Sequence, residues 1–149
     1  MLTLLPKHIS SILLFFIIFS ISTSLYAQKM AVVVNINNME KITTQMITQI
    51  YSDQRNFWST GNEILLFELP VKDQGRSVFS EALLNKSAMA SQADWSNRYV
   101  KNTIKNKVKI KPQKLVAKFV SIHEFAIGYI PLQIAEKHKN IKVVMVINQ

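Results

Sequence analysis

The stretch Glu63–Asn85, EILLFELPVKDQGRSVFSEALLN, joins a strand pattern directly to a helix pattern. Its first seven residues form a short aliphatic run with one aromatic, which is typical of a buried strand. Pro70 follows and cannot donate a ladder hydrogen bond, so we expect the strand to end there. Ser77 is the predicted N-cap of a helix whose apolar residues recur at helical spacing: Val78, Phe79, Ala82 and Leu83.

The loop inside this stretch carries two cations and one glycine just before the predicted helix. A helix start presents unpaired N–H groups and the positive end of its dipole, which suits an oxyanion. The predicted ligand-binding residues are therefore Lys72, Gly75, Arg76, Ser77 and Val78. Arg76 and Lys72 would supply charge, and Ser77 a hydroxyl donor. The alternative is an ordinary strand-to-helix connection with a capping serine.

Strand and helix patterns alternate along the rest of the chain. Three further strands are predicted, at Met30–Ile36, Phe125–Ile130 and Lys142–Ile147. Four further helices are predicted. The first begins near Thr43 and ends at Tyr51, and the second is Ala88–Val100, with a start at Ser91 as the alternative. The other two are Gln113–Glu124 and Gln133–Lys139. This alternation predicts an α/β fold, a three-layer sandwich with a mainly parallel sheet of about four strands.

The first 27 of the 149 residues have the pattern of a secretory signal peptide. Lys7 and His8 precede an apolar stretch, Ile9–Ile21, and the small residue Ala27 follows a polar segment. Cleavage after Ala27 would leave residues 28–149 as one domain in the periplasm, with membrane contact only through the signal peptide. The alternative is an uncleaved anchor, although the apolar run is short for a membrane span.

The composition argues against most catalytic and metal-binding classes. The chain has no cysteine, which excludes disulfides, thiolate metal sites and cysteine catalysis. His123 and His138 lack a metal-ligand spacing, and we find no nucleophile elbow, P-loop or dinucleotide fingerprint. We therefore predict a protein without enzymatic activity, metal or cofactor.

The positive charge is concentrated between Lys101 and Lys118, a segment with seven lysines and no acidic residue; the net charge of the chain is +9. Lysines alternate with other residues from Lys105 to Lys111, which predicts an extended ribbon. The ribbon could follow a polyanion, but it has no aromatic residue to stack on bases, which argues against nucleic acid. A solvated edge protected by lysines is the other interpretation.

Three segments, in order, resemble phosphate-binding periplasmic proteins of ABC importers. They are Ile47–Trp58 (ITQIYSDQRNFW), Leu69–Phe79 (LPVKDQGRSVF) and Ala126–Pro131 (AIGYIP). The resemblance implies a type II periplasmic-binding fold, phosphate or a similar oxyanion as ligand, and an importer permease as partner.

The chain also departs from that family. It is less than half as long, so it looks like a short, single-lobe relative, and Gly75–Val78 keeps one glycine and one hydroxyl of the family's phosphate loop. Weak oxyanion binding is therefore expected, and a dimer could replace the missing lobe. The alternative function is a periplasmic interaction module that binds an anionic protein, lipid or glycan through its lysine-rich segment.

Overall fold

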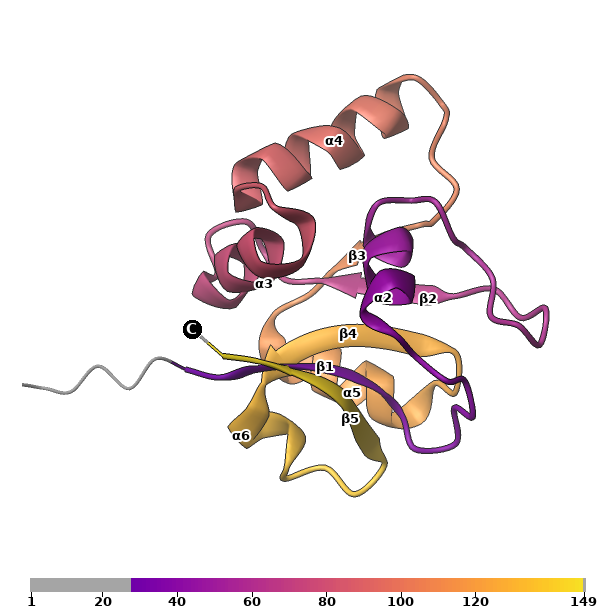
Figure 1. The fold of residues 1–149 in the computed structure, drawn as a ribbon, viewed down its shortest axis with the longest axis vertical. Coiled ribbons are helices and arrows are strands. Elements are labelled where there is room, and N and C mark those ends of the chain that lie inside the picture. The colour runs from indigo at the N-terminus through magenta and orange to yellow at the C-terminus, as the bar shows by residue number, and fades with distance from the viewer. Residues whose placement is uncertain (1–27, 149) are drawn as a thin grey trace, which may run out of the picture.

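The computed structural model describes residues 28–148, so the predicted signal peptide lies outside the described residues. Five strands and five helices form an α/β fold, as predicted (Figure 1). The strands are β1 (Met30–Asn35), β2 (Leu65–Glu68), β3 (Lys109–Ile110), β4 (Ala126–Pro131) and β5 (Ile141–Ile147). The helices are α2 (Thr44–Tyr51), α3 (Gln74–Leu84), α4 (Ala88–Val100), α5 (Gln113–Ile122) and α6 (Leu132–Ala135).

The strands form one sheet in the order β3-β2-β4-β1-β5. β2 pairs in parallel with β3 and β4, whereas β1 pairs antiparallel with both β4 and β5. Four of the five strands therefore run in the same direction, and the predicted mainly parallel sheet is confirmed. The strand beyond the four expected is β3, which the lysine-rich segment contributes.

Helices cover both faces of the sheet, which makes the predicted three layers. In Figure 1, α5 and α6 lie on one face, and α2 and α3 lie on the other. Gly128 of β4 lets α5 approach, because a Cβ there would be 2.5 Å from Cγ1 of Val116. On the opposite face, the ring of Tyr129 stacks on that of Phe79 with centroids 3.9 Å apart. α4 packs against α3.

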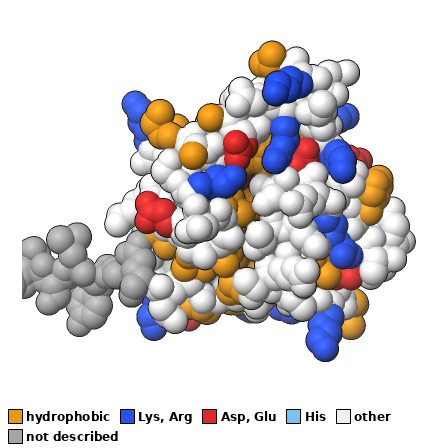
Figure 2. Space-filling view, turned by 45° about the horizontal axis from the view of Figure 1, so that its top comes forward, with side chains coloured by type: hydrophobic (Ala, Val, Ile, Leu, Met, Phe, Trp, Pro, Cys, Tyr) orange, Lys and Arg blue, Asp and Glu red, His pale blue; other side chains and the backbone are white. Residues whose placement is uncertain are grey.

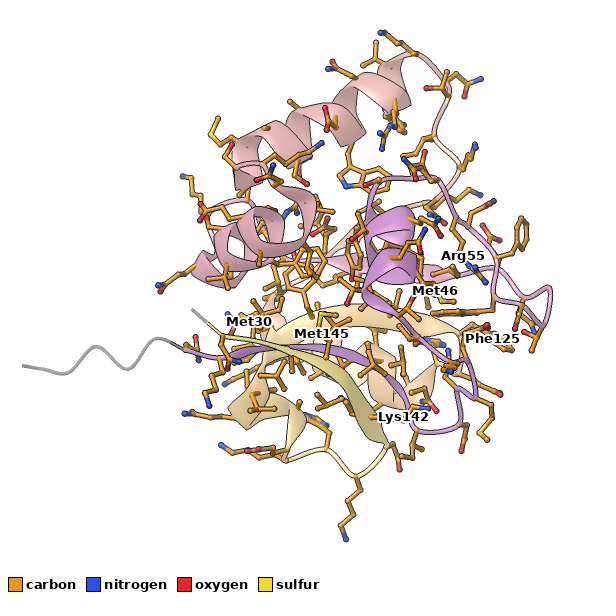
Figure 3. The ribbon with its side chains drawn as sticks, in the orientation of Figure 1. Met30, Met46, Arg55, Phe125, Lys142 and Met145 are labelled. Atoms are coloured by element: carbon orange, nitrogen blue, oxygen red, sulfur yellow. The ribbon has the colours of Figure 1, made fainter. Side chains whose placement is uncertain are left out.

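The core lies between these layers, where side chains from the sheet and the helices interlock (Figure 3). Met30 of β1 reaches the start of α3, where a Cβ on Gly75 would lie 2.5 Å from its Cε atom. Within residues 28–148, none of the helices has the length and apolar content that crossing a membrane requires.

The cap of α3 differs from the prediction, whereas α4 has the predicted bounds Ala88–Val100 and not the alternative start at Ser91. Asp73, not Ser77, caps α3, and its Oδ1 accepts a hydrogen bond from the Gly75 N–H at 2.8 Å. Aspartate caps a helix at least as well as serine does, so the earlier polar residue determines the start. α4 begins at Ala88 because Ser87 caps it, which leaves Ser91 inside the helix.

Candidate oxyanion site at the start of α3

A short turn carries the chain from β2 to α3, and the Asp73 N–H donates to the Pro70 carbonyl at 2.9 Å. The five predicted ligand-binding residues lie on this turn and on the first helical turns. One of them, Lys72, is exposed, and Ser77 is half-buried. The other three are buried: Gly75, Arg76 and Val78.

The Arg76 side chain is 0% exposed and points into the protein. Its Nε atom lies 3.1 Å from Oε2 of Glu68. Its two terminal nitrogens donate to the Leu69 carbonyl at 2.7 Å and to the Ser91 hydroxyl at 3.5 Å. The guanidinium thus joins the end of β2 to α4, and in this conformation its charge is directed at Glu68 rather than at solvent.

Glu68, the ion-pair partner of Arg76, is not among the residues predicted from the sequence. Burial raises the pKa of its carboxyl to about 7, although Arg76, the Tyr129 hydroxyl and the Trp95 indole act in the opposite direction. Tyr129 donates to Oε2, while Oε1 has no hydrogen-bond partner within the described residues. A single acid in an otherwise apolar strand, eight positions before an arginine, was the available signal for this ion pair.

The positive end of α3 already faces an acidic group. Asp73 accepts from the Gly75 N–H through Oδ1, and both of its carboxylate oxygens accept from Nε2 of Gln113 at 3.0 Å. The Ser77 hydroxyl makes no hydrogen bond within residues 28–148. Lys72 and Ser77 are therefore the groups at this helix start that remain available to an anion.

The lysine-rich segment is held by its backbone while its lysines face solvent. Asp53 accepts from the N–H groups of Lys105 and Asn106 at 3.0 and 2.7 Å, and Nδ2 of Asn106 donates to the Arg55 carbonyl at 2.8 Å. Lys105, Lys107 and Lys109 are exposed, whereas Asn106 is buried. Figure 2 shows Lys and Arg side chains distributed over one face, with apolar side chains exposed between them.

Metal binding gains no support from the described part of the chain, where no three His, Cys, Asp or Glu residues are grouped to hold an ion. The arrangement at the start of α3 can offer an anion the Lys72 ammonium and the Ser77 hydroxyl, because the N–H groups of Gly75, Arg76 and Ser77 already donate to Asp73. It offers no nucleophile–base pair.

No protein-family model and no curated protein matches the sequence. Two solved structures share the fold. An ABC-type phosphate transport receptor from Vibrio cholerae aligns with a TM-score of 0.53 at 13% identity, over 79% of this chain and 46% of that one. A protein of Clostridium perfringens described as a phosphate ABC transporter substrate-binding protein, solved with bound phosphate, aligns with a TM-score of 0.51 at 14% identity, over 82% of this chain and 56% of that one.

The chain therefore spans about half the length of each of these two structures. At these identities the similarity establishes the fold: the chain has the architecture of part of a phosphate-binding protein. The predicted resemblance to phosphate-binding proteins of ABC importers is confirmed at the level of structure.

Proposed function

We propose that this chain is an exported, one-lobe, solute-binding-like protein that binds phosphate or another small oxyanion weakly at the start of α3. The observation that carries the proposal is that an exposed Lys72 and an unbonded Ser77 hydroxyl belong to the same helix start, in a fold shared with phosphate-binding proteins. In this proposal Lys72 and Ser77 contact the anion, and the buried Gly75, Arg76 and Val78 hold the loop in place.

Weak binding follows from the charges around this helix start. A helix N-terminus stabilises an exposed anion by about 0.3–1 kcal/mol, and a hydrogen bond from a charged group adds about 1.5–3 kcal/mol. The Asp73 carboxylate opposes both contributions because it already accepts from the same backbone. We expect a dissociation constant of about 1 mM or weaker, because immobilising the ion removes part of the gain.

Export and partners belong to the same proposal. Cleavage after Ala27 would release residues 28–149 into the periplasm. An importer permease would then be the partner, or a second copy would act as the missing lobe. Intact-mass measurement of the protein from the cell envelope should show a chain that starts at Gln28; a chain that still carries Met1 would contradict export with cleavage.

The binding test is calorimetry with inorganic phosphate at low and physiological salt. Lys72→Ala and Ser77→Ala should each remove most of the heat, because each removes a direct contact. Lys41→Ala is the matched control, since it removes an exposed cation outside the loop and should leave the heat unchanged. No heat with the unaltered protein, or heat that survives both loop variants, would refute the assignment.

A second candidate function is favoured by the way the lysine-rich segment is held. Its exposed cations project from a backbone that Asp53 fixes with two hydrogen bonds. A fixed row of cations suits an anionic partner better than a free tail does, because less ordering is needed on binding. Such binding should weaken steeply as salt is added, whereas phosphate held by the α3 loop should be less sensitive.

A further inference from the structure

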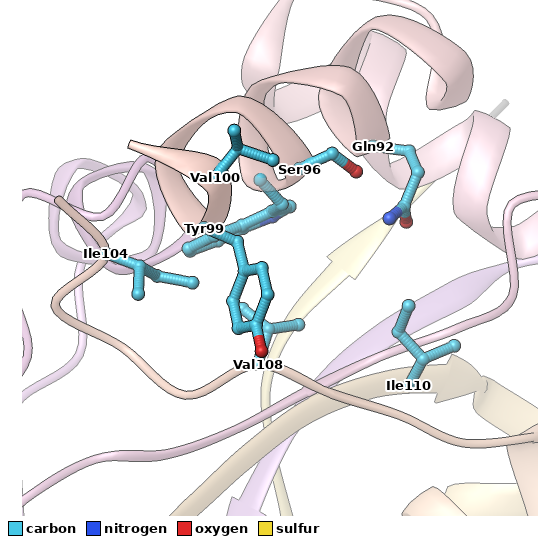
Figure 4. Close-up of a pocket in the computed structure, with 8 residues that line it drawn as sticks. Gln92, Ser96, Tyr99, Val100, Ile104, Val108 and Ile110 are labelled. Atoms are coloured by element: carbon cyan, nitrogen blue, oxygen red, sulfur yellow. The ribbon is translucent and has the colours of Figure 1, made fainter. Parts of the chain in front are cut away.

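An apolar groove separates α4 from the segment that leads into β3 (Figure 4). Its volume is about 240 Å³. Trp95 is buried in its wall at 5% exposure, while Tyr99 and Val100 are 76% and 82% exposed. Apolar side chains gathered at one exposed place indicate an interaction site. The oxyanion proposal uses none of these residues.

The size of the groove favours side chains over a whole small molecule. Pockets for drug-sized ligands are about 300–1,000 Å³ and enclose most of the ligand, whereas this groove is smaller and open to solvent. It can receive a few apolar side chains of another polypeptide.

One wall of the groove includes Ile110 of β3, which is an edge strand of the sheet. β3 is at the end of the strand order, and β2 is its one strand neighbour among the described residues. Along β3 and the segment that leads into it, apolar side chains and lysines line two different depressions. Ile104, Val108 and Ile110 line the groove. Lys107 and Lys109 instead line a second depression, together with Glu63, Ile64 and Leu65.

We propose that the groove and the free edge of β3 bind an extended segment of a partner protein in which acidic and apolar residues alternate. A peptide that adds to a sheet edge places alternate side chains on its two sides. Its apolar side chains would enter the groove beside Trp95, and its acidic ones would lie next to Lys107 and Lys109. This inference rests on the second proposed function and names the class of its anionic partner.

The charge at this edge selects among possible occupants. A second copy of the chain would bring its own lysines against Lys107 and Lys109, and like charges across a strand pair repel. A lipid surface would satisfy the lysines but offers no backbone N–H and C=O groups to the strand edge. An acidic, alternating polypeptide matches the lysines, the groove and the edge together.

The probe is a fluorescent synthetic peptide of about eight residues that alternates glutamate with valine or isoleucine, and binding is followed by anisotropy with the full domain. A second peptide has the same composition with its glutamates in one block. We expect the alternating peptide to bind at least about tenfold more tightly. In a single register on the strand edge, it can place its apolar side chains in the groove and its glutamates next to Lys107 and Lys109, whereas the block peptide cannot.

Protein variants separate the groove from the lysines. Ile110→Glu and Val100→Glu alter exposed groove positions and should each weaken binding about tenfold. Ile122→Glu changes a residue of α5 outside the groove, whose exposure of 59% lies between those of Ile110 and Val100, and should not. Lys107→Glu with Lys109→Glu should weaken binding similarly. Lys137→Glu with Lys139→Glu makes the same charge change at exposed positions elsewhere and should alter the affinity by less than about threefold.

The possible outcomes are distinct. Equal binding of both peptides, sensitive to the Lys107 and Lys109 changes but not to Ile110→Glu, would overturn the groove and leave the anionic-partner function standing. Binding of neither peptide would overturn both. If the protein binds phosphatidylglycerol vesicles but neither peptide, and Ile110→Glu abolishes vesicle binding, the surface is a lipid site and the inference is overturned. Circular dichroism of each variant confirms that it is folded.

Discussion

Arg76 and the lysines of the 101–111 segment are both cationic, and the fold uses them in opposite ways. The Arg76 side chain is fully buried and pairs with Glu68 at 3.1 Å. The side chains of Lys105, Lys107 and Lys109 are exposed, and it is the backbone beneath them that Asp53 holds. Where the positive charge lies in the sequence therefore does not tell which cations face a ligand.

The difference follows from desolvation. A buried guanidinium is stable only when an acidic group and further acceptors replace its hydration. For Arg76 these are Glu68, the Leu69 carbonyl and the Ser91 hydroxyl. An exposed lysine remains hydrated and contributes little to stability. We thus expect changes in the first region to alter the free energy of unfolding, and changes in the second to alter binding.

The largest expected effect comes from removing the buried cation. Arg76→Met leaves Glu68 without its ion-pair partner and the Leu69 carbonyl without its donor, and it should reduce the free energy of unfolding by about 3–5 kcal/mol at pH 8. Urea denaturation measures this. Arg98→Met is the control: Arg98 lies 5.5 Å above the Trp95 ring and is partly exposed, so its loss should cost no more than about 1 kcal/mol. Equal losses in the two variants would contradict a special role for burial.

The pH dependence of stability should come next in size. Burial raises the pKa of Glu68 from its ordinary value of 4.5 to about 7 in the folded protein. Between these values the folded state keeps a proton that the unfolded state releases, so stability should fall as pH rises from 4.5 to about 7 and then level off. The fall due to this carboxyl should be about 3–4 kcal/mol. Glu68→Gln has no such carboxyl, and a parallel pH slope in that variant would disprove the attribution.

A smaller effect is expected where the lysine-rich segment is attached. Asp53 has a left-handed backbone with a φ of 61° and accepts two backbone N–H groups. Asp53→Ala should reduce stability by about 2 kcal/mol and speed amide hydrogen exchange at Lys105 and Asn106. Asp53→Asn tolerates the left-handed backbone and keeps an acceptor oxygen, so its loss should be smaller. Unchanged exchange in Asp53→Ala would show that other contacts hold the segment.

The smallest effect should come from the lysines themselves. Replacing Lys105, Lys107, Lys109 and Lys111 together with glutamine should change the free energy of unfolding by less than about 1 kcal/mol, because three of these lysines are exposed, Lys111 is half-buried, and solvated charges contribute little. Thermal denaturation should show a shift of a few degrees at most. A large loss would mean that these side chains support the fold, and the contrast with Arg76 would no longer hold.

Local patterns in the sequence were sufficient for the fold class and for most elements, although β3 was not predicted as a strand and α6 is shorter than the predicted Gln133–Lys139. The β-branched run of β1 and the aliphatic run around Leu65–Glu68 predicted buried strands, since strand propensity and burial act on neighbouring residues. The alternating lysines predicted an extended segment, and β3 with its exposed Lys109 agrees with that prediction. The resemblance of three short segments to phosphate-binding proteins predicted the fold that the two solved structures share.

The candidate site depended on contacts between distant parts of the chain. Tyr129 donates to Glu68 across 61 positions, and Gln113 donates to Asp73 across 40. No spacing rule links such residues, because packing of the sheet against α3 and α5 brings them together. The reversed direction of β1 and the Arg76–Glu68 pair have the same origin.

The sequence by itself determined the order of the elements, the α/β class, the absence of cysteine chemistry and the segment where positive charge is concentrated. These properties follow from composition and from periodicities of two to four residues. The tertiary structure alone decided which cation is buried. It also decided that apolar side chains line the groove beside α4 on one side of β3, while Lys107 and Lys109 line a depression on the other. Burial and pairing are properties of the packed chain, because the cost of removing a charge from water depends on what surrounds it in space.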